Sequence, residues 1–362
     1  MNSRLIDIFI QAASINALSQ KEKPVADFIH SFLADSPFNI IEDDSNIKSG
    51  SDTGNIVCRI GDGGDFILLA HMDTARPTEK MRPVFQNGKI TSAGTSVLGV
   101  DNRLGIAILL YTLEKILKEN IQVKNFTVAF TTCEETTLLG SKNLRLSTHV
   151  SRGFVFDSSF RPGSFITSAC GSMGFKVKIT GKASHSGIAP ERGINSIAIA
   201  VNAIQKIKQG RVDQETTLNI GKINGGSAVN VVPEEVCLEG EVRSFKNEKV
   251  LELTEYVKKT FEDEANKLNA RVEFNAEWDF KPYKINEDST VYIEITEVLK
   301  KLNLKPEPQI SLGGSDANSL NELGIPSVNL GIGAQNPHSN DEFVLIEDMN
   351  KSAEIAMELV KK

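Results

Sequence analysis

Residues 65–73 read DFILLAHMD, an apolar run that ends in a histidine and an aspartate. Its length and composition predict a strand that is buried on both faces. Downstream, RLGIAILLYTLEKILK (103–118) predicts a strongly apolar helix, and NFTVAFTTCEE (125–135) predicts a further buried strand. Strand–helix–strand alternation of this kind is typical of a parallel or mixed sheet that is covered by helices. The predicted fold class is therefore α/β.

The chain continues this pattern on both sides of the central segments. The elements expected there, in chain order, are helices over 3–16 and 22–34, strands over 55–60 and 153–157, a helix over 288–303, a strand over 327–331 and a helix from about 346. The last three elements return, after Pro282, to the apolar style of the first half. We therefore expect residues 1–171 and 283–362 to form one domain.

Residues 172–282 differ in style, because their strands alternate apolar and polar side chains. Strands are expected over 175–182, 217–223, 236–245 and 271–280, and helices over 194–209 and 247–268. Alternation is typical of an antiparallel sheet that packs one face and exposes the other to water. The order β-α-β-β-α-β predicts a small, ferredoxin-like α+β domain that is inserted into the first domain.

Composition excludes several classes of function. The 47 Asp and Glu residues outnumber the 40 Lys and Arg residues, and the net charge of −7 argues against nucleic-acid binding. The longest apolar runs fall far short of the ~18 residues that a membrane span needs. The first residues lack the features of a signal peptide, and the four cysteines are too far apart for a redox or zinc motif. We expect a soluble cytoplasmic protein with neither nucleic acid nor membrane as a partner.

Acidic and imidazole side chains recur where predicted strands end. Five segments carry them: AHMDTA with His71 and Asp73, GVDNRLG with Asp101, TTCEET with Glu134 and Glu135, VFDSS with Asp157, and NPHSNDE with His338. Each has an ordinary structural explanation when taken alone, such as a helix N-cap for Asp101 or a turn for Asp157. Together they supply the ligand types for two divalent cations with one bridging carboxylate, and a further carboxylate that could serve as general base.

These motifs, in this order along nearly the whole chain, resemble the co-catalytic zinc peptidases and deacylases. That family includes peptidase T, glutamate carboxypeptidase, acetylornithine deacetylase and succinyl-diaminopimelate desuccinylase. The resemblance implies a three-layer catalytic domain with an inserted lid, and two Zn²⁺ per chain that Co or Mn could replace. A homodimer through an edge strand of the lid domain is a further expectation.

The resemblance also implies a role for each motif residue. It places His71 and Asp157 on one cation, Glu135 and His338 on the other, and Asp101 between them. Asp73 would orient His71, and Glu134 would take a proton from the attacking water and pass it to the leaving nitrogen. The family often has Asp where this chain has Asn102, which weakens the expectation of the strained peptide that similar enzymes have after the bridging aspartate.

Further motifs resemble the lid and substrate segments of the family. KASHSG implies that His185, of the same subunit or of a partner, stabilises the oxyanion. SAVNVVPEE and EVRSF imply that Asn230 and Arg243 lie near a substrate carboxylate, although an Arg in an alternating strand is usually a solvated face residue. GGSDAN offers backbone donors at Gly313 and Gly314.

The motifs HMDT and VFDSS, with Asp at position 157, are most similar to those of the tripeptide-aminopeptidase branch of the family. The expected activity is release of the N-terminal residue from tripeptides, with Arg243 and Asn230 holding the free α-carboxylate. Two alternatives within enzymes are a metal-dependent carboxypeptidase and an N-acyl-amino-acid deacylase. An alternative from another class is a catalytically inactive, peptide-binding homologue.

Overall fold

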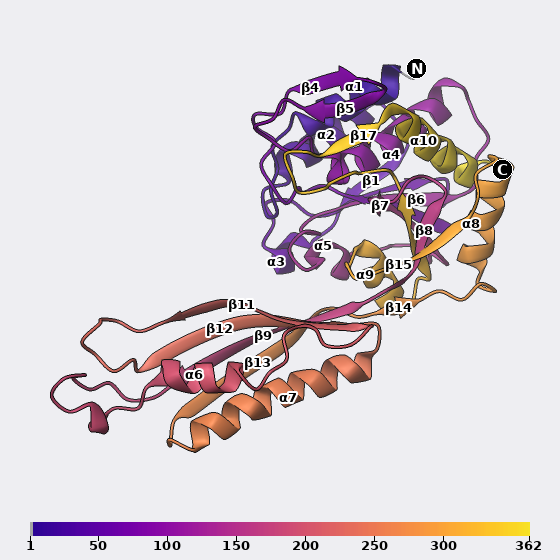
Figure 1. Cartoon of the computed structure of the whole chain (residues 1–362). Helices are drawn as coiled ribbons and strands as arrows, with labels where there is room; N and C mark the ends of the chain where they lie inside the picture. Colours follow the sequence, from indigo (N-terminus) through magenta and orange to yellow (C-terminus); the bar gives the residue numbers. More distant parts are fainter. Residues whose placement is uncertain (1–2) are drawn as a thin grey trace. The chain divides into compact units, whose positions relative to one another are not determined.

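The computed structural model describes residues 3–362, which divide into two compact units (Figure 1). The larger unit comprises residues up to Ser168, Lys284–Ser311 and Ser315–Lys362, and the inserted unit comprises Ala169–Tyr283 and Leu312–Gly314. The sequence predicts an insertion at 172–282 alone. The additional segment Leu312–Gly314 joins the inserted unit because Phe280 and Arg243 contact it, as described below.

The larger unit is built on a nine-stranded sheet with the strand order β1-β2-β6-β3-β7-β16-β8-β14, in which β15 also pairs with β8. The strands are β1 (Asn39–Glu42), β2 (Ile56–Ile60), β3 (Phe66–His71), β6 (Phe126–Thr131), β7 (Gly153–Ser158), β8 (Ser164–Ala169), β14 (Tyr283–Lys284), β15 (Glu307–Ser311) and β16 (Ser327–Gly331). The four central strands β6, β3, β7 and β16 run parallel. Their carboxyl ends therefore meet at one edge of the sheet, where ligands bind in α/β folds.

Helices cover this sheet. They are α1 (Ser3–Ala13), α2 (Lys23–Leu33), α3 (Asn46–Ser49), α4 (Val100–Lys118), α5 (Leu139–Lys142), α8 (Thr290–Lys301), α9 (Asp316–Glu322) and α10 (Ile346–Val360). Both α4 and α9 pack against β3 and β7, and Figure 1 shows them on opposite sides of β7. All six residues of β3 are buried, as its apolar sequence predicts. Helix α4 approaches closely at Gly105, where a Cβ would lie 2.3 Å from the carbonyl oxygen of Phe156.

Some elements of the larger unit differ from the prediction. The strand expected over 125–135 ends at Thr131, and the residues after it form a turn. A separate three-stranded sheet, with the order β17-β5-β4, was not predicted. Its strands are β4 (Pro83–Gln86), β5 (Lys89–Ser92) and β17 (Phe343–Leu345). They are too short to carry a clear apolar pattern.

The inserted unit is a five-stranded antiparallel sheet with the order β10-β11-β12-β9-β13. Its elements are β9 (Gly171–Thr180), the 3₁₀ turn η1 (Pro190–Arg192), α6 (Ser196–Ile204), β10 (Gly210–Arg211), β11 (Thr216–Gly225), β12 (Glu235–Ser244), α7 (Asn247–Asn266) and β13 (Arg271–Phe280). Helices α6 and α7 pack on the sheet over an apolar core that includes Phe175, Val177 and Phe261. The predicted helix over 194–209 is shorter than expected, because the chain turns after Ile204 toward Gly210, which has a φ of 76°.

This architecture confirms the predicted fold class, an α/β domain that carries an inserted α+β domain; the two-residue strand β10 is an addition to the predicted order βαββαβ. Among residues 3–362, no helix combines the length and the apolar character that crossing a bilayer would require.

Candidate metal centre

The acidic and imidazole residues of the motifs come from neighbouring parts of the larger sheet. His71 is the last residue of β3, and Asp157 lies near the end of β7, the parallel neighbour of β3. Glu134 and Glu135 lie in the turn that follows β6, on the other side of β3. The parallel register therefore brings these side chains to one edge of the sheet.

Asp101 lies between two imidazoles. Its Oδ1 is 3.0 Å from Nε2 of His71, and its Oδ2 is 3.1 Å from Nε2 of His338. Nε2 of His338 is also 3.0 Å from Oε1 of Glu135, and Nε2 of His71 is 3.3 Å from Oδ1 of Asp157. The structure thus brings together all five residues that the sequence predicts as metal ligands.

Two overlapping groups of these side chains could each hold a cation. One consists of His71, Asp101 and Glu135, and the other of His71, Glu134 and Asp157; within each group the donor atoms lie within 4.8 Å of one another. The predicted assignment differs in that it places Glu135 with His338 and leaves Glu134 outside both sets. Imidazole nitrogen and carboxylate oxygen are donors that suit zinc and similar divalent ions.

Asp73 lies behind His71, on the side away from Asp101. Its Oδ1 is 3.2 Å from Nδ1 of His71, so that Nε2 faces the other carboxylates. Asp73 is fully buried and accepts a hydrogen bond of 2.6 Å from Oγ of Ser19. A carboxylate in this position fixes the orientation and tautomer of a metal-binding imidazole.

The electrostatics of the cluster show an excess of negative charge. Burial, together with repulsion from Asp157 and Glu135, raises the pKa of Glu134 well above its usual value, although His71 opposes the shift. Burial lowers the pKa of His71, but nearby Glu134 and hydrogen bonds to Asp101, among others, outweigh it and raise that pKa well above 6.5. Hydrogen bonds to Asp101 and Glu135 raise the pKa of His338 to about 10.

Arg103 is fully buried in the same unit but points its guanidinium elsewhere. It donates hydrogen bonds to the backbone carbonyls of Met72 and, at 3.2 Å, of Ala12. The carboxylates of the cluster therefore gain no direct hydrogen bond from it. Within residues 3–362, the ion pairs of these carboxylates and two imidazoles are only with one another and not with a lysine or arginine. Divalent cations would neutralise such a set, so the residues present fit a metal site.

Several residues around the cluster were not identified from the sequence. Glu342 is buried and accepts hydrogen bonds from the N–H groups of Gly99 (2.6 Å) and Asp101 (3.1 Å), and it therefore fixes the backbone that carries Asp101. Burial raises its pKa to about 7. It follows His338 in NPHSNDE, but only its burial, which that motif does not reveal, distinguishes it from a solvated acid. The peptide bond between Asp101 and Asn102 is cis.

Asp316 is a second acidic residue that the sequence did not single out, although GGSDAN contains it. It is buried at the start of α9 and accepts a hydrogen bond from the hydroxyl of Thr131, which pairs with His71 across β6 and β3. Burial raises the pKa of Asp316 to about 6. It adds a further carboxyl group close to Glu134.

The inserted unit carries the other predicted site residues. His185 is exposed, and its Nδ1 accepts hydrogen bonds of 3.2 Å from the N–H groups of Gly187 and Ile188. With Nδ1 as acceptor, the neutral ring carries its proton on Nε2. Asn230 is also exposed, and its backbone carbonyl accepts a hydrogen bond of 3.0 Å from the N–H of Ser186.

Arg243 lies in β12, with its guanidinium already paired. It donates two hydrogen bonds to the carboxylate of Glu241, at 3.0 and 2.9 Å, and one of 3.3 Å to the carbonyl of Leu312. Gly313, next along the chain, is exposed. Gly314 packs against the ring of Phe280, which a Cβ would approach to 2.5 Å, so close packing is sufficient reason for a glycine there.

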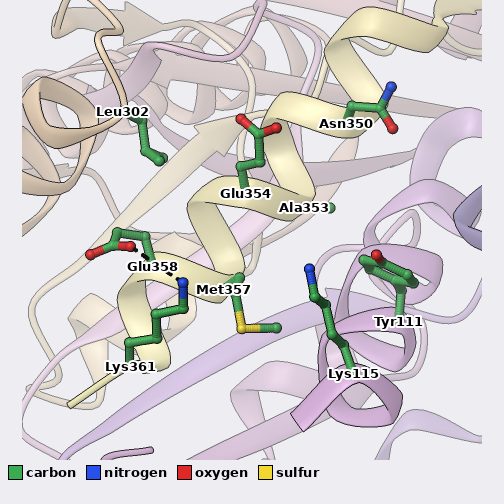
Figure 2. Close-up of a pocket in the computed structure, with 9 residues that line it drawn as sticks. All are labelled: Tyr111, Lys115, Leu302, Asn350, Ala353, Glu354, Met357, Glu358 and Lys361. Atoms are coloured by element: carbon green, nitrogen blue, oxygen red, sulfur yellow. Dashed lines mark ion pairs between the residues drawn. The ribbon is translucent and has the colours of Figure 1, made fainter. Parts of the chain in front are cut away.

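A surface pocket of about 370 Å³ lies elsewhere in the larger unit, between α4 and α10 (Figure 2). Its walls include Tyr111 and Lys115 from α4 and Met357 and Glu358 from α10. Glu358 is 3.9 Å from Nζ of Lys361 within this pocket. The pocket contains none of the predicted site residues.

Comparison with known proteins gives this geometry a context. The family profile described as "Peptidase dimerisation domain" matches residues 167–269. YqjE of Bacillus subtilis (strain 168), a protein described as uncharacterized, is 32% identical over 363 residues, which cover 99% of this chain and 98% of YqjE. Peptidase T of Fusobacterium nucleatum is 26% identical over 83% of this chain and 74% of its own length.

Solved structures agree with these matches. A tripeptidase from Staphylococcus aureus is 32% identical, with a TM-score of 0.91 over 99% of this chain and 97% of its own. The aminopeptidase PepT from Bacillus cereus is 29% identical, with a TM-score of 0.87 over the same shares. A Bacillus subtilis protein described as a dinuclear metal-binding peptidase of the M20 family has the same fold, with a TM-score of 0.69 at 20% identity over 99% of this chain and 96% of its own. The family predicted from the motifs is thereby confirmed: the chain belongs to the M20 family of metallopeptidases.

Proposed function

We propose that this peptidase is a two-zinc aminopeptidase that releases the N-terminal residue of tripeptides. The observation that carries the proposal is the position of Asp101, whose two carboxylate oxygens face the two different imidazoles of His71 and His338. Relatives of 32% and 29% identity that are described as a tripeptidase and as the aminopeptidase PepT support the tripeptide specificity.

The metal ligands follow from this arrangement. We assign His71 and Asp157 to one cation, Glu135 and His338 to the other, and Asp101 to both. When bound, the two cations would supply Lewis acidity toward the scissile carbonyl and the attacking water. The nitrogen and oxygen donors favour zinc, and Co or Mn would fit the same donor set.

Glu134 is the proposed general base. Two features support this role: it is half-buried beside Asp157 and Glu135, and those neighbours and its burial raise its pKa. A carboxylate with a raised pKa can take a proton from water and return it to a leaving amine. Its backbone N–H donates to Asp73 at 3.1 Å, and therefore the residue that orients His71 also holds the base.

The inserted domain supplies the proposed substrate contacts. With its proton on Nε2, His185 can donate a hydrogen bond to a developing oxyanion. Arg243 has the planar, two-pronged shape that suits a free α-carboxylate, with Asn230 and the backbone N–H groups of Gly313 and Gly314 as further donors. The match to a dimerisation domain supports a homodimer that forms through this domain, and His185 would then act in its own subunit or in its partner's.

A competition between substrates tests the proposal. The zinc-loaded protein is incubated with one tripeptide sequence in its free, C-terminally amidated and N-acetylated forms, with a dipeptide, with a longer peptide and with an N-acetyl amino acid. Mass spectrometry should show release of the N-terminal residue from the free tripeptide in preference to all the others. Release of the C-terminal residue would favour a carboxypeptidase, preferred cleavage of the N-acetyl amino acid a deacylase, and no cleavage at all an inactive, peptide-binding homologue.

A further inference from the structure

Four consecutive backbone N–H groups, in the turn that carries Glu134 and Glu135, are held by side chains from three distant segments. The hydrogen bonds run from Thr132 to Oδ1 of Asn55 (3.0 Å), from Cys133 to Oε1 of Glu22 (2.9 Å), and from Glu134 and Glu135 to Oδ1 and Oδ2 of Asp73 (3.1 Å each). All three accepting side chains are fully buried. We call residues 132–135 the base turn.

The base turn has a backbone that needs such support. Cys133 has a φ of 51°, and Thr137 and Leu138, a few residues further on, have φ values of 67° and 61°. Non-glycine residues adopt this left-handed region only at a cost in free energy, and surrounding contacts must maintain it. The placement of the Glu134 carboxylate therefore depends on groups outside the turn.

Glu22, just before α2, uses its carboxylate to hold the base turn. Its carboxylate accepts hydrogen bonds from the N–H of Cys133, the thiol of Cys133 (3.3 Å), the N–H of Gln20 (2.9 Å) and the hydroxyl of Ser51 (2.5 Å). It belongs to neither group of possible metal ligands. Among residues 3–362 no ion pair to Glu22 is found, so these four hydrogen bonds are what compensates the burial of its carboxylate.

Asn55 holds the same region through both ends of its amide. Its oxygen accepts the hydrogen bond from Thr132, while its nitrogen donates at 3.0 Å both to the carbonyl of Gly140 and to Oδ2 of Asp43. It therefore joins the start of the base turn to α5, on the far side of the left-handed residues. Glu22 and Asn55 fix the turn on the side that Asp73 does not reach.

We propose that Glu22 and Asn55 are positioning residues that hold the base turn, and with it Glu134, in the geometry required for catalysis. This role rests on the proposed function of Glu134 as general base. Whether Glu22 and Asn55 hold residues 132–135 in place can nevertheless be tested without a substrate. In this proposal neither residue contacts the substrate or the cations, and Glu22 lies outside both groups of possible metal ligands. Their contribution is to the placement of Glu134, and a misplacement of about 1 Å can cost on the order of 100-fold in rate.

Paired substitutions separate the hydrogen bonds of Glu22 from its charge. Glu22→Ala removes the acceptor of the Cys133 N–H, and we expect kcat at saturating zinc to fall by about 10–100-fold with KM unchanged. Glu22→Gln keeps an oxygen for that N–H and offers its amide to Ser51, so it should restore most of the activity. Asn55→Ala should also lower kcat. Glu294→Ala is the matched control, because Glu294 is a half-buried carboxylate of the same unit that pairs with Lys124 and Arg152 instead.

Alkylation of Cys133 provides the readout that needs no substrate. The thiol is buried under Glu22, so N-ethylmaleimide should label Cys133 faster in Glu22→Ala than in the wild type, in Glu22→Gln or in Glu294→Ala, as mass spectrometry of the labelled peptide would show. Folded Glu22→Ala with wild-type labelling and wild-type kcat would overturn the proposal; if that variant does not fold, the same two measurements on Asn55→Ala decide. A wild-type protein that cleaves no peptide would refute the proposed function, while the labelling would still decide whether Glu22 holds the turn.

Discussion

The metal centre of the larger unit and the inserted sheet both carry many charged side chains, but the two regions differ in how deeply these side chains are buried. At the metal centre Asp73 and His71 are buried, and Asp157 is nearly so. In the inserted unit, charges such as Lys249 and Asp213 form ion pairs that remain in contact with water, with side chains 43% and 37% exposed. Charges in a low-dielectric environment interact strongly and need compensation, whereas exposed pairs are screened by water and salt. Chemistry is therefore expected where charge of one sign is buried in excess.

The largest effect is expected from substitution of the proposed general base, Glu134. Glu134→Gln keeps the size of the side chain but cannot accept the proton of the attacking water. We expect kcat to fall by about 10²–10⁴-fold while both cations remain bound. Steady-state kinetics and metal analysis by mass spectrometry would measure the two effects on the same sample. If the Glu134→Gln enzyme retains wild-type kcat, another group is the base.

Removal of the shared ligand should loosen both cations. Asp101→Ala deletes the carboxylate that faces both imidazoles, and we expect the affinity for each of two cations to fall by more than about 100-fold, since losses of 10–100-fold already follow from changes behind a ligand. Titration against a chromophoric chelator would measure both affinities. In the wild type a strong chelator should also lower the unfolding temperature, and in Asp101→Ala this effect should be small. Retention of one cation at wild-type affinity would show that Asp101 is not shared.

Arg243, in the inserted unit, should affect substrate binding rather than turnover. Arg243→Ala removes a charged donor for the substrate carboxylate. Loss of its hydrogen bonds to that carboxylate should raise the KM for tripeptides by about 10–100-fold. C-terminal amidation of the peptide should produce the same loss in the wild type and no further loss in the variant. Glu241→Gln is the complementary change, because it weakens the pairing that now occupies Arg243 and should lower KM. Equal KM values for free and amidated peptides would exclude this role of Arg243.

Features of the molecule that leave a pattern in the sequence could be predicted. The apolar run that ends at His71 gave the central strand, and the order of the motifs gave the family, because both are local patterns. The five predicted ligands do lie together, since parallel strands bring their carboxyl ends to one edge. The resemblance also implied a division of the donors between two cations, which the proposed function keeps. The patterns did not reveal that Glu134 lies with His71 and Asp157 in one group of neighbouring donor atoms, because this depends on side-chain geometry.

The supporting residues escaped prediction for a physical reason. Glu22 holds the backbone of Cys133, 111 residues away, and Glu342 holds that of Gly99, 243 residues away. Neither contact leaves a local signal, because a buried glutamate and a solvated one have the same sequence. The paired state of Arg243 was missed for a similar reason: Glu241 alternates with it on β12, a spacing that is equally typical of a solvated strand face.

The smallest effect is expected at an exposed pair of the inserted unit. A hydrogen bond from Lys249, helped by one from the N–H of Glu215, lowers the pKa of Asp213 from 3.8 to about 2. Because the folded pKa lies below the unfolded one, the pair stabilises the protein above pH 3.8, and this contribution is lost as the pH falls toward 2. Asp213→Asn should therefore lower the urea midpoint only slightly at pH 6, and by still less at pH 2, where the folded carboxyl is about half protonated. The small difference should vanish in about 1 M salt, because water and ions screen an exposed pair. If Asp213→Asn lowered the urea midpoint strongly even in about 1 M salt, this ion pair would not be screened by water and ions. The contrast between the inserted unit and the metal centre would then be wrong.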